Sequence, residues 1–185
     1  MIYLNNFGTR TIYTNRCILR RFELRDSLLV FNNYMSDKSI AKYLVNEEHK
    51  SIYETELLIS EFIKNYNNIS YYNWLIVDKL NFNVIGTISL HEVDILNDKV
   101  EVGIIISKKY QNKGYAQEVV SEVISYAFNV LKVKRIEAKV MNENDKSKSL
   151  FLSLGFKNEG ILYSSVKKNN KYFDVSIFSL LNIYI

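Results

Sequence analysis

Ten residues that join an expected strand to an expected helix carry the clearest chemical pattern in the chain. They run from Lys108 to Gln117 and read K-K-Y-Q-N-K-G-Y-A-Q. A tight turn at the start of a helix leaves several consecutive backbone N–H groups without partners inside the helix. Together with the positive end of the helix dipole, these groups favour a phosphate or diphosphate ligand. Gly114 would let the ligand approach the backbone, and Lys113 would add a positive charge nearby.

The alternative interpretation of this segment is an ordinary strand-to-helix junction in which the glycine only relieves backbone strain. The segment lacks the G-x-x-x-x-G-K-[ST] pattern of nucleoside triphosphatases and the G-x-G-x-x-G pattern of dinucleotide enzymes. Both of those enzyme classes are therefore disfavoured.

The elements that must position this segment follow from hydrophobic periodicity. A strand at Lys99–Ser107 precedes it, and apolar residues at helical spacing predict a helix from Gly114 to about Leu131. The other expected strands are Cys17–Phe22, Asn73–Val77, Val84–Val93, Ile136–Val140, Ile161–Val166 and Tyr172–Leu181, and the other expected helices are Asp26–Met35, Ser51–Tyr66 and Asp145–Leu154.

Local signals fix some of the boundaries of these elements. The carboxylate of Asp26 is expected to cap its helix by accepting a backbone N–H. Gly155 is expected to end the last helix in the left-handed conformation. Short turns at Asn81–Asn83, Asn97-Asp98 and Asn169-Asn170 make the strands around them antiparallel neighbours. The order of elements predicts an α/β fold with a mixed, mostly antiparallel sheet of about 6–7 strands flanked by helices.

The size and composition of the chain exclude several classes of function. A length of 185 residues suits one domain over residues 1–185. The net charge of +4 is mild, and the densest basic stretch, Lys167–Lys171, looks like a solvated turn, so nucleic-acid binding is not favoured. Cys17 is the only cysteine, which excludes an intrachain disulfide. With His49 and His91 as the only histidines, no Cys/His zinc site can form, and no metal is expected.

The sequence contains no targeting or membrane signal. Met1 to Arg10 lacks the apolar stretch, preceded by basic residues, that marks a signal peptide. No apolar run approaches the roughly 18 residues that a membrane-spanning helix needs. A cytoplasmic location without a membrane partner is the resulting expectation.

Four motifs in the same order resemble the GNAT acetyltransferase superfamily. Q-N-K-G-Y-A at Gln111–Ala116 resembles its Q/R-x-x-G-x-G/A signature, with alanine in the last glycine position. The remaining matches are Glu101–Ile106 as its fourth strand, Asn144-x-x-Ser147 with Leu154-Gly155-Phe156 as its N-x-x-S…L-G-F helix, and Arg16–Arg20 with Asp26 as the opening of the branch that holds ribosomal-protein and polyamine acetyltransferases. The resemblance covers roughly residues 14–181 and implies a GNAT-like fold.

The resemblance implies acetyl-coenzyme A (acetyl-CoA) as cosubstrate and places it on this sequence. The main-chain amides of Gln111, Asn112, Lys113, Gly114, Tyr115, Ala116 and Gln117 would hold its diphosphate. Ile104, Ile105 and Ile106 would pair with the pantetheine arm, and an amide in that strand would stabilise charge on the thioester oxygen. Asn144 would hydrogen-bond the coenzyme from the other side. The alternatives are a plain core strand for the isoleucines and a helix cap for Asn144.

The acceptor must attack as a neutral amine. An α-amine with a pKa near 8 is neutral in about one molecule in ten at pH 7, whereas a lysine-like amine at ~10.4 is neutral in about one in 2,500. Glu101, at the start of the strand beside the thioester, is the candidate to take the proton. Its alternative role is that of a surface glutamate at a sheet edge.

One position departs from the family pattern. Many members carry a tyrosine four residues before the glycine of L-G-F, where it protonates the leaving thiolate; here that position is Phe151. Because a thiol with a pKa of about 8.5 leaves readily, water or Ser147 could act as the relay.

Three functions follow from the resemblance. The first is acetyl transfer to a protein or peptide N-terminus, as in ribosomal-protein acetyltransferases. The second is acetyl transfer to a polyamine such as spermidine, which the adjacent carboxylates Glu47 and Glu48 could attract, although a solvated acidic loop is the simpler interpretation. The third is a non-catalytic CoA-binding sensor or interaction module, which Phe151 keeps open. The sequence leaves the acyl chain length and the oligomeric state, including a homodimer, undetermined.

Overall fold

An eight-stranded sheet organises the computed structural model, which describes residues 7–183. Its strands are β1 (Ile12–Tyr13), β2 (Cys17–Arg20), β3 (Tyr72–Asp78), β4 (Val84–Asp94), β5 (Lys99–Ile106), β6 (Arg135–Met141), β7 (Lys157–Lys168) and β8 (Lys171–Leu181). Their spatial order is β1-β2-β3-β4-β5-β6-β8-β7. All neighbours are antiparallel except β5 and β6, which are parallel. Residues 1–6, the start of the segment predicted not to be a signal peptide, lie outside the described residues.

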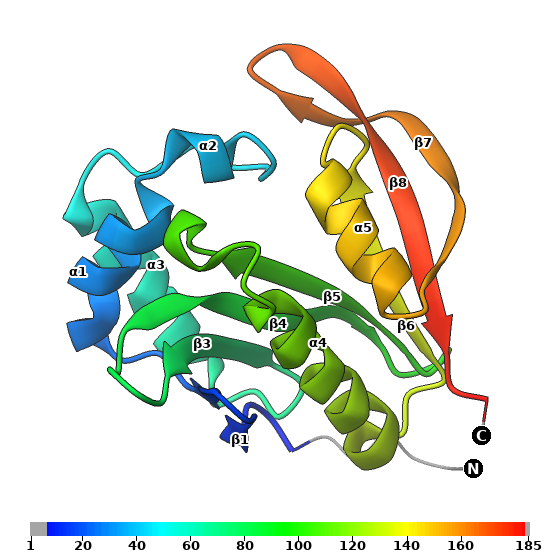
Figure 1. Ribbon diagram of the computed structural model, residues 1–185, viewed down its shortest axis with the longest axis horizontal. Coiled ribbons are helices and arrows are strands. Elements are labelled where there is room, and N and C mark those ends of the chain that lie inside the picture. The colour runs from blue at the N-terminus through cyan, green and yellow to red at the C-terminus, as the bar shows by residue number, and fades with distance from the viewer. Residues whose placement is uncertain (1–6, 184–185) are drawn as a thin grey trace.

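Helices cover both faces of the sheet (Figure 1). They are η1 (Leu24–Asp26), α1 (Ser27–Val30), η2 (Phe31–Met35), α2 (Lys38–Ala41), α3 (Ile52–Asn65), η3 (Lys108–Tyr110), α4 (Tyr115–Tyr126), η4 (Ala127–Leu131) and α5 (Asp145–Ser153). The apolar stripe of α4 packs with Phe151 of α5 into one buried cluster, around Trp74 and Ile88 of the sheet. Val30 of α1 and Ile59 of α3 build a second cluster on the opposite face.

The predicted fold class is confirmed, with one strand more than expected. The seven predicted strands are present, and the additional strand β1 has only two residues, too few for an alternating pattern. The four-residue helix α2 was also missed, for the same reason. The predicted end of α5 at Gly155 is confirmed, since Gly155 has a left-handed φ of +85°. The predicted turn between β7 and β8 is also confirmed, with φ of +49° at Asn169 and +58° at Asn170.

The predicted helix cap at Asp26 is wrong. No backbone N–H at the head of α1 bonds to its side chain. The carboxylate instead binds Arg20 through two contacts of 2.7 Å and accepts the N–H of Glu23 at 2.8 Å. The guanidinium on β2 therefore draws Asp26 back toward the sheet, away from the helix that follows it.

Two features of β5 shape the future site. Its parallel pairing with β6 covers only Lys99–Glu101 against Arg135–Glu137, so the two strands separate beyond that point. On its other edge β5 approaches β4 very closely at Gly86, where a Cβ atom would lie 2.0 Å from the carbonyl oxygen of Ile105. This contact requires glycine and holds the far end of β5 against β4 while it diverges from β6.

Candidate functional site

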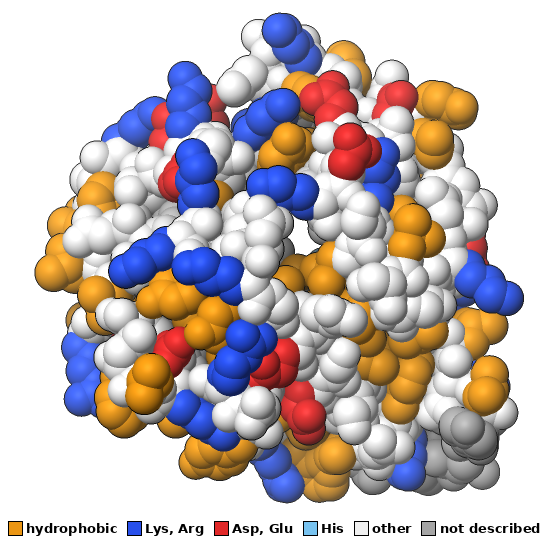
Figure 2. Space-filling model, viewed as in Figure 1, with side chains coloured by type: hydrophobic (Ala, Val, Ile, Leu, Met, Phe, Trp, Pro, Cys, Tyr) orange, Lys and Arg blue, Asp and Glu red, His pale blue; other side chains and the backbone are white. Residues whose placement is uncertain are grey.

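The separation of β5 from β6 opens a cleft of about 1540 Å³. It is lined by β3, β4 and β5 on one side, by β6 and α5 on the other, and by α2 and the start of α4 at its ends. Figure 2 shows the surface hollowed near its centre, with apolar side chains inside the opening. The cleft therefore lies beside the strand-to-helix segment at residues 108–117, the candidate binding segment predicted from the sequence.

The turn before α4 carries a row of free backbone N–H groups. The N–H groups of Tyr110 and Gln111 bond within the preceding turn, and that of Glu118 bonds to Gly114. In the described part of the chain, the N–H groups of residues 112–117 between them have no protein acceptor. Asn112 and Gly114 reach this path with φ of +58° and +78°. The turn can therefore receive an anion with several oxygens.

The predicted binding residues in this segment reach the cleft to different degrees. Gln111, Asn112, Gly114, Ala116 and Gln117 line the cleft. Lys113 and Tyr115 do not line it, so only their backbone can serve the site. The ammonium of Lys113 lies 5.9 Å from the centre of the ring of Tyr110, a residue that lines the cleft.

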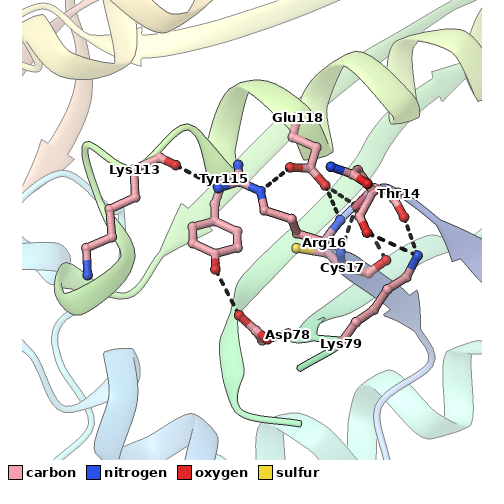
Figure 3. A network of polar contacts seen from close by, with 9 residues as sticks. Thr14, Arg16, Cys17, Asp78, Lys79, Lys113, Tyr115 and Glu118 are labelled. Carbon is pink, nitrogen blue, oxygen red and sulfur yellow. Dashed lines mark hydrogen bonds and ion pairs between the residues drawn. The ribbon is translucent and has the colours of Figure 1, made fainter. Parts of the chain in front are cut away.

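A polar network behind the turn holds it in place (Figure 3). Arg16, just before β2, donates from Nη1 to the carbonyl of Lys113 at 3.0 Å, and its guanidinium carbon lies 4.1 Å from the centre of the Tyr115 ring. Glu118 of α4 fixes that guanidinium at 2.6 Å. The hydroxyl of Tyr115 donates to Asp78 at 2.9 Å. Arg16 was matched as part of a family motif, but its role in supporting the turn was not expected.

Glu118 is itself well satisfied within this network. Its Oε1 accepts the hydroxyl of Thr14 and the backbone N–H of Arg16, both at 2.6 Å. Burial alone would raise the pKa of Glu118, but the bonds from Thr14 and Arg16 outweigh it and leave the pKa below its usual value. The carboxylate is therefore ionised at neutral pH and pairs with Arg16.

The predicted strand Ile104–Ile106 has one open edge. The N–H of Ser107 bonds to Ile85 on β4 at 2.8 Å. Because backbone groups alternate between the two edges of a strand, the N–H groups of Ile104 and Ile106 face away from β4, toward the gap left by β6. The side-chain amide of Gln111 already bonds the Ile106 carbonyl there at 3.0 Å. An extended ligand could therefore add to this edge.

Glu101 lies behind two other side chains and does not line the cleft. His91 Nε2 lies 3.2 Å from its Oε1, and Lys139 Nζ lies 2.7 Å from its Oε2. Burial would raise the pKa of Glu101, but the close contacts with His91 and Lys139 outweigh it and lower the pKa. Glu101 is thus an ionised, nearly buried carboxylate, with a side chain only 9% exposed.

His91 is the residue that sequence reasoning missed. It lines the cleft with a side chain 45% exposed, and its Nδ1 lies 3.4 Å from the hydroxyl of Ser89. Gly103 makes room for it, since a Cβ there would lie 3.0 Å from the imidazole. The feature that would have identified His91 is the register of β4 and β5, which places it directly opposite Glu101. That register depends on a bulge after His91, which the sequence did not specify.

The predicted residues of α5 form the opposite wall. Asn144 caps the helix, with its Oδ1 accepting the N–H of Ser147 at 3.2 Å, and both residues line the cleft. The cap occupies the oxygen of Asn144 and leaves its NH₂ group as a donor. Phe151 is 2% exposed and packs against Phe156 and Phe178. Because phenylalanine has no hydroxyl, the hydroxyl groups that α5 presents to the cleft come from its serines, Ser147 among them.

A second hollow of about 400 Å³ lies beside the cleft, between α2 and the turn that joins β7 to β8. Its charged side chains are five lysines and two glutamates, Lys38, Lys42, Lys50, Lys168, Lys171, Glu47 and Glu48. Glu48 pairs with Lys50. Glu47 and Glu48, the acidic pair considered above as an attraction for a polyamine, are therefore surrounded by a larger number of positive charges.

Two other possibilities have no support within residues 7–183. No helix there combines the length and apolar character that a membrane span requires. His, Cys, Asp and Glu side chains in the same residues do not gather in groups of three as metal ligands would.

Comparisons with known proteins match this geometry. The family model described as an acetyltransferase (GNAT) domain matches residues 16–157. The chain is 34% identical to an uncharacterised N-acetyltransferase, p20, of Bacillus licheniformis, over 92% of this chain and 96% of the relative. It is 29% identical to a spermidine N(1)-acetyltransferase of Vibrio cholerae, over 88% and 91%.

Solved structures give the same picture. A spermidine N-acetyltransferase from Vibrio cholerae, in complex with CoA and spermine, superposes with a TM-score of 0.77 at 28% identity, covering 90% of this chain and 95% of that one. A ribosomal-protein-S5-alanine acetyltransferase from Vibrio fischeri superposes with a TM-score of 0.82 at 21% identity, covering 94% of this chain and 97% of that one. At this low identity, the similarity shows that the two proteins share a fold.

Proposed function

The chain belongs to the GNAT acetyltransferase family and is an N-acetyltransferase, and we propose that its acceptor is the α-amine at the N-terminus of a protein or peptide. We further propose that the acetyl donor is acetyl-CoA, as in the family. The free N–H groups of residues 112–117 fit its diphosphate, and the open edge of β5 fits its pantetheine arm. The N–H groups of Ile104 and Ile106 would stabilise the charge that develops on the thioester oxygen.

The observation that carries the choice of acceptor is the excess of lysines over carboxylates around the cleft and the hollow beside it, although Glu92, Glu143 and Asp145 also line the cleft. Lys139 lines the cleft, and its close ion pair with Glu101 raises its pKa, so it stays protonated. The neighbouring hollow holds five lysines against two glutamates, and one of these lysines, Lys42, lines the cleft as well. A polyamine would bring several positive charges into this environment, whereas an α-amine with a pKa near 8 loses its single charge at small cost.

Proton removal from the acceptor is assigned to His91, with Glu101 as its positioning residue. The imidazole lines the cleft, while the carboxylate behind it orients the ring. The role predicted for Glu101 is thus exerted through His91. Ser147, or a water beside it, would supply the proton to the leaving thiolate, since Phe151 cannot donate one.

Polyamine acetylation is the second candidate, because spermidine acetyltransferases are among the similar proteins. Thiol release from acetyl-CoA separates the candidates when the protein is given short peptides with free N-termini, the same peptides with blocked N-termini, or spermidine. We expect turnover with free N-termini alone. Turnover with spermidine alone would refute the peptide acceptor. CoA binding without thiol release from any acceptor would favour the non-catalytic module.

A further inference from the structure

The lysines at the mouth of the cleft form an interaction surface that the proposed reaction does not use. This lysine rim consists of Lys38, Lys42, Lys50, Lys168 and Lys171. Figure 2 shows Lys and Arg side chains gathered over α2 and the loop after it. The rim is formed by segments far apart in the sequence, since α2 and its loop meet the turn between β7 and β8.

The rim carries more positive than negative charge: two carboxylates, Glu47 and Glu48, line the same hollow as the five lysines, and Glu48 pairs with Lys50. Lys168 donates to the carbonyls of Ala41, Leu44 and Asn46 at 2.6, 2.8 and 3.0 Å, which fixes its position without neutralising it. Among the described residues, Lys38 and Lys171 are in no ion pair, and Lys42 is 3.9 Å from the exposed carboxylate of Glu143. The rim is therefore a positively charged surface in which Lys168 is held in a fixed position by hydrogen bonds.

The rim is continuous with the cleft. Lys42 lines both hollows, and its neighbours Ile40, Tyr43 and Leu44 line the cleft as well. A peptide whose N-terminal amine reached His91 would leave the cleft past α2. Its following residues would then meet the lysines.

We propose that the lysine rim binds carboxylates of the acceptor, so that the preferred acceptor is a protein with acidic residues a few positions after its N-terminal amine. This rests on the proposed function and adds the chemical class of the acceptor. Charge complementarity at an exposed surface acts mainly on encounter and KM, and salt weakens it. The preference should therefore appear in kcat/KM at low ionic strength, with kcat nearly unchanged.

The test uses three peptides that share their first three residues and then carry four acidic, four neutral or four basic residues. Wild-type protein should acetylate the acidic peptide with a kcat/KM about tenfold above the neutral one at low salt, and the ratio should fall toward one at high salt. The double variant Lys38→Glu/Lys171→Glu should reverse the order of the acidic and basic peptides.

A matched control separates local contact from long-range attraction. Lys64 and Lys157 are exposed lysines outside both hollows, so Lys64→Glu/Lys157→Glu changes the net charge equally. The control should keep most of the preference for the acidic peptide. Equal kcat/KM for the three peptides, or equal losses in both double variants, would overturn the rim as a binding surface and leave the peptide acceptor standing. Should the rim variant fail to fold, the salt dependence of the wild-type protein still decides the point.

Discussion

Replacing Arg16 with alanine should weaken coenzyme binding although Arg16 does not line the cleft. Its guanidinium holds the carbonyl of Lys113 and lies against Tyr115, so it orders the turn whose N–H groups face the ligand. In the Ala variant Glu118 keeps its bonds to Thr14 and to the backbone N–H at position 16, so no buried carboxylate is stranded. The loss is then concentrated on the turn.

The magnitude follows from the two contacts that reach the turn. A hydrogen bond from a charged donor contributes about 1.5 kcal/mol, and a cation over an aromatic ring at an exposed site about 0.5 kcal/mol. The side chain of Arg16 is 39% exposed, so screening reduces this total to roughly 1–2 kcal/mol. If the ligand must supply this ordering free energy, Kd for CoA rises about tenfold.

Isothermal titration of CoA measures this effect, and Arg21→Ala is the matched control. Arg21 also donates to a backbone carbonyl, that of Thr9 at 2.8 Å, and its guanidinium carbon lies 5.1 Å from the centre of the Tyr66 ring, away from the turn. Both variants should lose some thermal stability, but only Arg16→Ala should lose affinity. Equal CoA affinity in the two variants would refute a role for Arg16 in positioning the turn.

Four further expectations concern the site and its scaffold. His91→Gln should lower kcat about 100-fold and Glu101→Gln about tenfold. The double variant should be no slower than His91→Gln, because Glu101 acts through His91. Additive losses in the double variant, or a loss in the control Glu137→Gln similar to that in Glu101→Gln, would contradict this coupling. Gly114→Val should abolish CoA binding while circular dichroism is retained, because φ is +78° and a Cβ would lie 3.3 Å from Arg16; unchanged affinity would count against the diphosphate assignment. Gly86→Ala should lower the free energy of unfolding by about 2–3 kcal/mol, and an unchanged urea midpoint would disprove the close contact with Ile105. The pKa of Glu118 is lowered in the fold, so its contribution to stability is present above the unfolded-state pKa of about 4.3 and is lost as the pH falls through the folded-state pKa. Glu118→Gln should therefore destabilise the protein at pH 7, and this loss should shrink as the pH is lowered; a loss that does not change with pH in urea titrations would contradict the assignment.

The sequence was sufficient where local chemistry decides structure. The helix after Gly114, the end of α5 at Gly155 and the two-residue turn at Asn169 follow from periodicity and from residues that tolerate positive φ. The amide row at residues 112–117 could be located for the same reason, since it results from a turn that enters a helix.

The sequence was insufficient where partners come from distant segments. Asp26 looked like a cap because its neighbours do not reveal that Arg20 reaches it across the end of β2. His91 drew no catalytic assignment from the sequence, because its contact with Glu101 depends on the register between β4 and β5. The lysines around Glu47 come from two parts of the chain that meet only in the folded protein.

A crystal structure of the protein with CoA tests the central claim most directly. We expect the diphosphate oxygens within hydrogen-bonding distance of the N–H groups of residues 112–117, and the pantetheine arm along the open edge of Ile104–Ile106. A diphosphate bound away from this turn, or a pantetheine arm outside the gap between β5 and β6, would contradict the account.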